Sequence, residues 1–240
     1  DVGRAYGAGP DSLAWILQSF LLGCIVFMLP VGKVTEKVGC RLVFMAGMAV
    51  FVISALIAPL QTEYAGFLAS RALQGLGSAM IFATNNSILS LTFPPEKRGF
   101  AMGWNISMVF LGSTLGPCVG GLANFYFGWR SIFWIFAAVG SLALAFSFVS
   151  MRDPMRLPHT GKGADWIGIV LYGLSMLLTM GGLAEISRCD WAVWAFTGGI
   201  VLAVLLVVLH ADDDLVHAEH LGQELGAAND LLGPLQHGAV

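Results

Sequence analysis

Long apolar stretches recur along this chain, and they constrain its fold more than any other feature. A transmembrane helix needs about 20 mostly apolar residues, and roughly seven stretches reach or approach that length. They run approximately over residues 12–32, 42–60, 64–92, 100–125, 131–150, 165–185 and 191–210. We therefore predict an all-α protein, a polytopic bundle of transmembrane helices.

The composition supports a membrane protein and argues against several other classes. The chain is 57% hydrophobic and only 11% charged, whereas soluble domains carry about 25% charged residues. The net charge of −3 and the lack of a basic face argue against nucleic-acid binding. The four cysteines have neither metal-ligand nor disulfide spacing, so we interpret them as small buried thiols.

The distribution of basic residues predicts how the chain is oriented. Eight lie in the loops after the first, third and fifth stretches, and three lie in the alternate loops. The eight are Lys33, Lys37, Arg41, Lys97, Arg98, Arg152, Arg156 and Lys162, and the three are Arg4, Arg130 and Arg188. By the positive-inside rule, the chain starts outside an inner (plasma) membrane and its tail is cytoplasmic. Since residue 1 is Asp and no signal peptide opens the chain, we expect at least one upstream helix.

Arg71 is the most informative single residue, because it lies inside the third apolar stretch. A charge within a span is expensive and points to function. The alternative is an arginine that extends to the outer interface. Its neighbours Ser70, Gln74, Gly75 and Gly77 are small or polar, which is typical of helix contacts or a cavity. We expect a carboxylate partner on a helix outside this chain, because no Asp or Glu lies mid-span.

Three further patterns are candidates for function. Gly112, Gly116 and Gly120 share one helix face, which allows close backbone approach, and Pro117 predicts a bend. Residues 32–41 form a short, charged, glycine-punctuated segment, which is either functional or an ordinary loop that sets topology. The mid-span Asn85 and Asn86 either contact substrate or join helices, since amides in lipid must be satisfied internally.

The last 30 residues differ from the rest. From about Ala211 the chain is acidic, with no Lys or Arg and with scattered histidines. The pair His217 and His220 has the spacing of metal ligands, but we interpret the segment as a disordered acidic tail or the product of a frameshift or wrong gene end. The histidines lie outside or at the edges of the spans, which disfavours a haem protein or membrane hydrolase. We therefore expect no enzymatic activity, no cofactor and no metal.

Several of these motifs, taken together and in order, resemble the major facilitator superfamily, specifically its fourteen-span drug:proton antiporter group. The inner-loop signature matches at Gly32, Val34, Glu36, Lys37, Gly39 and Arg41. Glu36 stands where the family usually has Asp, and Cys40 where it usually has Arg. The fourth-helix signature matches at Arg71, Gln74, Gly75 and Gly77, and the antiporter signature at Gly112, Gly116, Pro117, Gly120 and Gly121. Trp15 and Gln18 resemble the second-helix pattern, and Asp165 and Trp166 the start of the first extra helix between the halves.

The resemblance implies a proton-coupled antiporter that works by alternating access on drugs or other small molecules. Residues 32–41 would be an inner latch, Arg71 with Gln74 and Gly75 would serve proton coupling, and the Gly-Pro motif would favour exchange. Trp15, Gln18, Asn85 and Asn86 are candidates for the substrate cavity.

The resemblance also implies a division of the chain. Residues 1–150 would be an N-terminal half without its first helix, 151–164 a cytoplasmic loop, 165–210 two linker spans and 211–240 the acidic tail. The partners implied are protons, a small molecule, the bilayer and a missing second half. The alternative is a remnant that does not transport.

Overall fold

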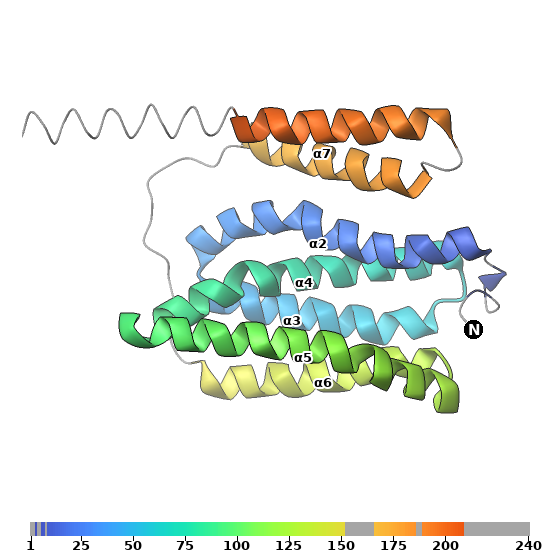
Figure 1. The fold of residues 1–240 in the computed structure, drawn as a ribbon. Coiled ribbons are helices and arrows are strands. Elements are labelled where there is room, and N and C mark those ends of the chain that lie inside the picture. The colour runs from blue at the N-terminus through green and yellow to red at the C-terminus, as the bar shows by residue number, and fades with distance from the viewer. Residues whose placement is uncertain (1–2, 4–5, 8, 152–165, 186–188, 209–240) are drawn as a thin grey trace, which may run out of the picture.

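The computed structural model describes residues 3, 6–7, 9–151, 166–185 and 189–208. These residues form a bundle of long helices and contain no strand (Figure 1), so the predicted all-α fold is confirmed. The helices are α2 (Pro10–Val38), α3 (Cys40–Ile57), α4 (Tyr64–Thr92), α5 (Pro95–Phe127), α6 (Arg130–Ser150) and α7 (Trp166–Glu185), with a short 3₁₀ turn η1 (Ala58–Leu60) after α3. A last helix runs over Asp190–Val208. The division into domains stays a prediction, and most of the 151–164 loop and all of the 211–240 tail lie outside the described residues.

Six of the described helices are long and apolar enough to cross a membrane, and α4 is the one expected span that is not among them. The reason lies in its polar residues, of which Ser70, Gln74, Ser78 and Thr84 are buried in the bundle. Helix α4 packs mainly against α2 and α3 and lies between them in Figure 1. A helix shielded by protein on two sides does not need the hydropathy of one that faces lipid.

The expected loop over residues 32–41 is mostly helical, so that expectation is wrong in its shape. Helix α2 continues through Pro30 to Val38, although most residues after Pro30 are Val, Gly or Thr, which have low helix propensity. Lys33 and Glu36 form an ion pair at 3.2 Å across one turn, and the Thr35 hydroxyl donates to the Val31 carbonyl at 2.8 Å. At 29 residues, α2 is about 44 Å long and extends beyond a hydrocarbon core of about 30 Å.

Gly39 makes the turn between α2 and α3. Its φ of 101° lies in a region that residues with a Cβ rarely adopt. The Gly39 amide donates to the Thr35 carbonyl at 2.9 Å, which closes the end of α2. The two helices are therefore joined by one residue, and their basic ends are held at the same end of the bundle.

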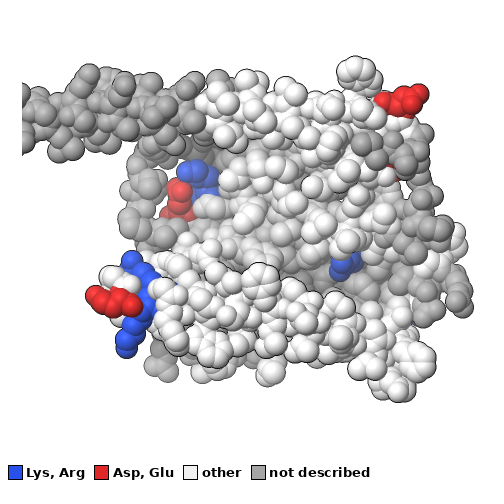
Figure 2. Space-filling model, viewed as in Figure 1, with Lys and Arg blue, Asp and Glu red and all other residues white. Residues whose placement is uncertain are grey.

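Charge is segregated along the bundle axis. The end where α2 stops and α3 and α5 begin carries Lys33, Lys37, Arg41, Lys97 and Arg98. In Figure 2 most of the charged side chains on the visible face lie at the ends of the bundle, and the surface between them is largely uncharged. This arrangement fits the predicted membrane orientation, which stays a prediction.

Glycines at two helix crossings bring α4 close to α2 and to α3. A Cβ at Gly75 would lie 2.2 Å from the Phe20 carbonyl oxygen of α2, and one at Gly23 would lie 2.2 Å from the Ala72 carbonyl oxygen of α4. On the other side, a Cβ at Gly77 would lie 2.7 Å from the Phe51 amide nitrogen of α3. Distances below 3 Å to backbone atoms leave no room for a side chain, so these glycines fix the helix crossings.

The remaining helices pack less tightly. Of the 33 residues of α5, only Ala101 and Ala123 are buried, although α5 touches α4 and α6. Helix α7 contacts α2 and pairs with Asp190–Val208, where the Ser175 hydroxyl donates to the Gly199 carbonyl at 3.1 Å. In Figure 1 this pair forms a separate layer on the α2 side.

We expect Gly75→Ala to destabilise the bundle, because its Cβ cannot fit without moving α2. Overpacking of this kind costs about 1–3 kcal/mol. The matched control is Gly112→Ala, where no atom lies within 4 Å of the added Cβ and helix propensity favours alanine. Thermal unfolding in a mild detergent, followed by circular dichroism, measures both. Equal melting temperatures for the two variants would contradict the assigned α2–α4 contact.

Candidate functional site

Arg71 lies on α4 where α2, α4 and α6 meet. It is about 10 Å along the helix from Tyr64, by the rise of an α-helix. Its Nε donates to the Ile16 carbonyl of α2 at 3.5 Å, and its guanidinium donates to Gln74 Oε1 one turn further along α4. The guanidinium carbon also lies 4.9 Å from the centre of the Phe20 ring and 5.6 Å from that of Phe133. The charge is thus held by a carbonyl, an amide and two aromatic faces.

Within the described part of the chain, no carboxylate forms a salt bridge with Arg71, and the ion pair found there joins Lys33 and Glu36. A buried cation ordinarily requires an anionic partner. Gln74 is only 1% exposed, and its Nε2 amide has no hydrogen-bond partner among the described residues. Arg71 and Gln74 together therefore form a polar site inside the bundle that is rich in donors and incomplete in acceptors.

An aromatic cluster lies next to this site. Tyr6, Phe67, Trp129 and Phe133 pack ring against ring, with centroids 5.5–6.1 Å apart for the pairs that join them. The Tyr6 hydroxyl donates to the Gln61 carbonyl at 2.7 Å, which ties the segment before α2 to the connection between η1 and α4. Sequence reasoning missed this cluster, because its members come from three segments far apart in the sequence.

The structure does not gather the predicted cavity residues around Arg71. Trp15 donates its indole N–H to Glu185 Oε1 of α7 at 3.1 Å, so it links α2 to the α7 pair. Asn85 and Asn86 lie on α4 about 21–23 Å from Arg71, by the helix rise. The Gln18 Oε1 atom is buried without a partner among the described residues. A role in substrate binding stays a prediction for all four.

The predicted latch residues do come together at the basic end of α2 and α3. Gly32, Glu36 and Lys37 lie on the last turns of α2, Gly39 makes the turn, and Arg41 lies on the first turn of α3. A small cavity of about 270 Å³ lies beside Glu36, between α2 and the end of α4. The position is consistent with a contact surface at this end, and the latch role stays a prediction.

The antiporter motif on α5 faces open space. No atom lies within 4 Å of a Cβ added at Gly112, Gly116, Gly120 or Gly121. Helix α5 continues through Pro117, and the Ser113 hydroxyl donates back to the Val109 carbonyl at 2.9 Å. Among the described helices, none therefore uses this glycine face for close approach.

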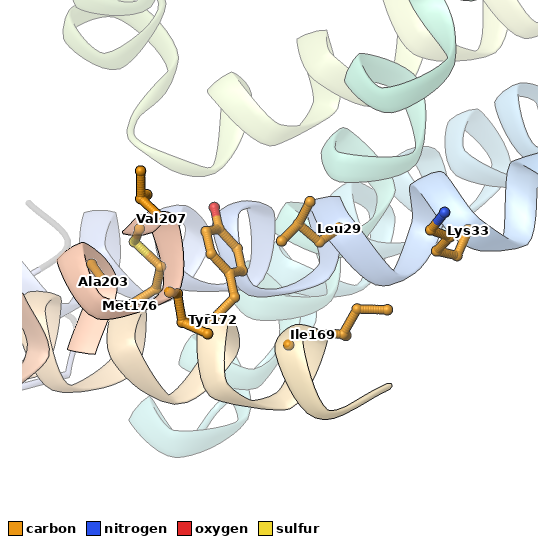
Figure 3. A pocket seen from close by; sticks show the side chains of 9 residues that line it. Leu29, Lys33, Ile169, Tyr172, Met176, Ala203 and Val207 are labelled. Carbon is orange, nitrogen blue, oxygen red and sulfur yellow. The ribbon is translucent and has the colours of Figure 1, made fainter. Parts of the chain in front are cut away.

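An apolar crevice of about 410 Å³ lies between α2, α7 and Asp190–Val208 (Figure 3). Its walls include Leu29, Ile169, Tyr172, Met176 and Val207, and Lys33 lies at one end. Sequence reasoning did not predict it, because hydropathy does not reveal which helices pair. Its hydrophobic lining suits an acyl chain or an apolar small molecule.

The described residues contain no group of three or more His, Cys, Asp and Glu side chains that could hold a metal ion. All five histidines, including His217 and His220, lie outside the described residues. The polar site that the structure describes is the Arg71 guanidinium, which lies among aromatic rings, a backbone carbonyl and a side-chain amide. These neighbours compensate its buried charge.

The chain belongs to the Major Facilitator Superfamily, because the model of that family matches residues 1–211. It is therefore a multi-pass membrane protein of a transporter family. The predicted family is confirmed.

Relatives with assigned names include exporters and a vitamin transporter. The chain is 32% identical over 214 residues to the multidrug resistance protein Stp of Mycobacterium tuberculosis (strain CDC 1551 / Oshkosh), covering 86% of this chain and 40% of that protein. It is 31% identical to the tetracenomycin C resistance and export protein of Streptomyces glaucescens, covering 80% and 35%. It is 28% identical to the riboflavin transporter RibZ of Clostridioides difficile (strain 630), covering 73% and 38%. The chain thus spans about two fifths of the length of these relatives.

We expect Arg71→Met to leave the fold intact and to raise its melting temperature slightly. Removing a buried charge that has no carboxylate partner also removes its desolvation cost and leaves no opposite charge unpaired, which offsets the loss of its hydrogen bonds. Thermal unfolding of the 240-residue chain in detergent measures this, with Phe133→Ala as the control that opens a cavity in the same place. A fall for Arg71→Met as large as that for Phe133→Ala would contradict the view that this charge costs the fold stability.

Proposed function

We propose that this chain is part of a secondary transporter that exports drugs or other small molecules in exchange for protons by alternating access. The observation that carries the proposal is Arg71, a cation held inside the bundle with no carboxylate partner among the described residues. A charge inside a membrane span costs free energy, and its retention points to a role in function. The relatives named for multidrug resistance and for tetracenomycin C resistance and export support the direction of transport.

The proposed proton coupling rests on the lack of a carboxylate partner for Arg71 among the described residues. In our proposal an acidic side chain on another helix faces the guanidinium in one state and is protonated in the other. A carboxylate next to a guanidinium stays ionised, because an opposite charge nearby lowers its pKa. When substrate or helix movement separates the two, the acid takes up a proton. Gln74, which already accepts one hydrogen bond from Arg71, holds the guanidinium in place during the exchange.

Alternating access needs an opposing set of helices, and we propose that a second half supplies it. The open glycine face of α5 and the end of α2 that carries Glu36 and Lys37 are the surfaces that we assign to that contact. Pro117 weakens the helix ladder of α5 where it would have to flex. Glu36, with the basic residues around it, is placed to pair across the inner end. On this view the 240-residue chain alone does not transport.

The test is a transport assay on the longest reading frame that contains this chain. Inverted membrane vesicles are energised, and substrate-induced proton release is followed with a pH-sensitive dye, using a panel of apolar and cationic drugs. We expect Arg71→Ala to reduce exchange by at least about tenfold, since a hydrogen bond to a charged group contributes about 1.5–3 kcal/mol. Arg71→Lys keeps the charge but loses the planar fork, so we expect partial activity.

The control variant is Arg98→Gln, an exposed arginine near the start of α5 whose Nε donates to the Phe93 carbonyl at 3.1 Å. It should leave exchange unchanged. Export that survives Arg71→Ala would refute the coupling role of Arg71. Export that persists when the proton gradient is collapsed would refute antiport, and absence of export by any variant would favour a non-transporting remnant.

A further inference from the structure

A second apolar crevice lies between α3 and α6, on a face of the bundle away from Arg71. Its volume is about 560 Å³, and its walls include Leu42, Met45, Ala46, Leu144 and Phe148. Leu42 is 62% exposed and Phe148 61% exposed, so this face presents apolar side chains outward over its length. In a membrane protein such a face contacts lipid.

Arg41 lies at the end of this crevice and is unusual among the basic residues. Its Nε is buried and has no hydrogen-bond partner among the described residues. By contrast, Lys33, which borders the crevice beside α7, is already paired with Glu36 at 3.2 Å. An unpaired buried guanidinium N–H is costly, so the geometry calls for an anion or acceptor at this point.

The start of α3 adds to the positive potential at the same place. Arg41 is on the first turn of α3, whose N-cap Gly39 supplies no side-chain cap and whose first turn contains no acidic residue. Free backbone N–H groups at a helix N-terminus attract phosphate. The guanidinium fork binds phosphate oxygens in pairs. Neither feature alone defines a site, but here both meet at the end of an apolar crevice.

We propose that an anionic phospholipid occupies the α3–α6 crevice, with one acyl chain between the two helices and its phosphate on Arg41. The basic end of the bundle is the one that the positive-inside rule assigns to the cytoplasm, so the lipid comes from the inner leaflet. Anionic lipids of that leaflet are attracted by Lys and Arg side chains close to the membrane surface. This inference does not depend on what the protein transports.

Native mass spectrometry of the full 240-residue chain in a mild detergent, titrated with phosphatidylglycerol or phosphatidylcholine, tests the proposal. We expect phosphatidylglycerol to bind with one preferred stoichiometry and about tenfold more tightly than phosphatidylcholine, from the charge-assisted bonds of one guanidinium. Arg41→Gln should lose most of that preference. Arg98→Gln, an exposed arginine at the same end, should keep it.

A second pair of variants tests the crevice itself without touching Arg41. Ala46→Phe places a ring in the crevice, and Ala145→Phe places the same ring on an exposed site of α6 that does not line it. We expect Ala46→Phe to weaken binding of both lipids, and Ala145→Phe to have no effect. Circular dichroism of each variant checks that helix content is retained.

Three outcomes would overturn the proposal. One is equal loss with Arg41→Gln and Arg98→Gln, which would indicate diffuse surface charge. Another is equal binding by Ala46→Phe and the unaltered chain. The third is full competition by glycerol phosphate, which would indicate a headgroup site without the crevice.

Discussion

The close approach of α4 to α2 and α3 is the contact on which the rest of this bundle depends. In lipid, apolar side chains gain little by meeting each other, so helices associate through tight packing and hydrogen bonds. Gly23 with Gly75 and Gly47 with Gly77 bring the backbones together on the two sides of α4. This double contact is what allows a helix too polar to rank with the other membrane spans to lie in the centre of the bundle.

The same contact makes Arg71 tolerable. Gly75 lies one turn from Arg71 and draws α2 inward, which brings the Ile16 carbonyl and the Phe20 ring within reach of the guanidinium. A larger residue at Gly75 would move away the groups that compensate the charge. Packing and electrostatics are therefore coupled along a single turn of α4, and the signature Arg71, Gln74, Gly75 and Gly77 is understandable as one structural unit.

Much of the fold could be predicted from apolar stretch length, because the bilayer thickness sets how long a helix must be. Helix ends could not be predicted in this way, since hydropathy indicates which residues lie in the bilayer and not how far a helix extends beyond it. Pro30 illustrates this, because α2 continues eight residues past it to Val38. Arg71 was predictable as a charge inside a span. Its partners Ile16 and Phe20, and the Trp15–Glu185 bond, depend on helix pairing that local sequence does not encode.

Glycines on different helices of this chain have two different outcomes. On α4, neighbouring backbones pack directly against Gly75 and Gly77, whereas on α5 Gly112, Gly116 and Gly120 face open space. Each glycine weakens an exposed helix by about 1 kcal/mol relative to alanine, and Pro117 removes a further hydrogen bond. A row of such residues stabilises nothing unless another backbone approaches it. This cost fits the proposal above, in which an opposing half packs against the glycine face of α5.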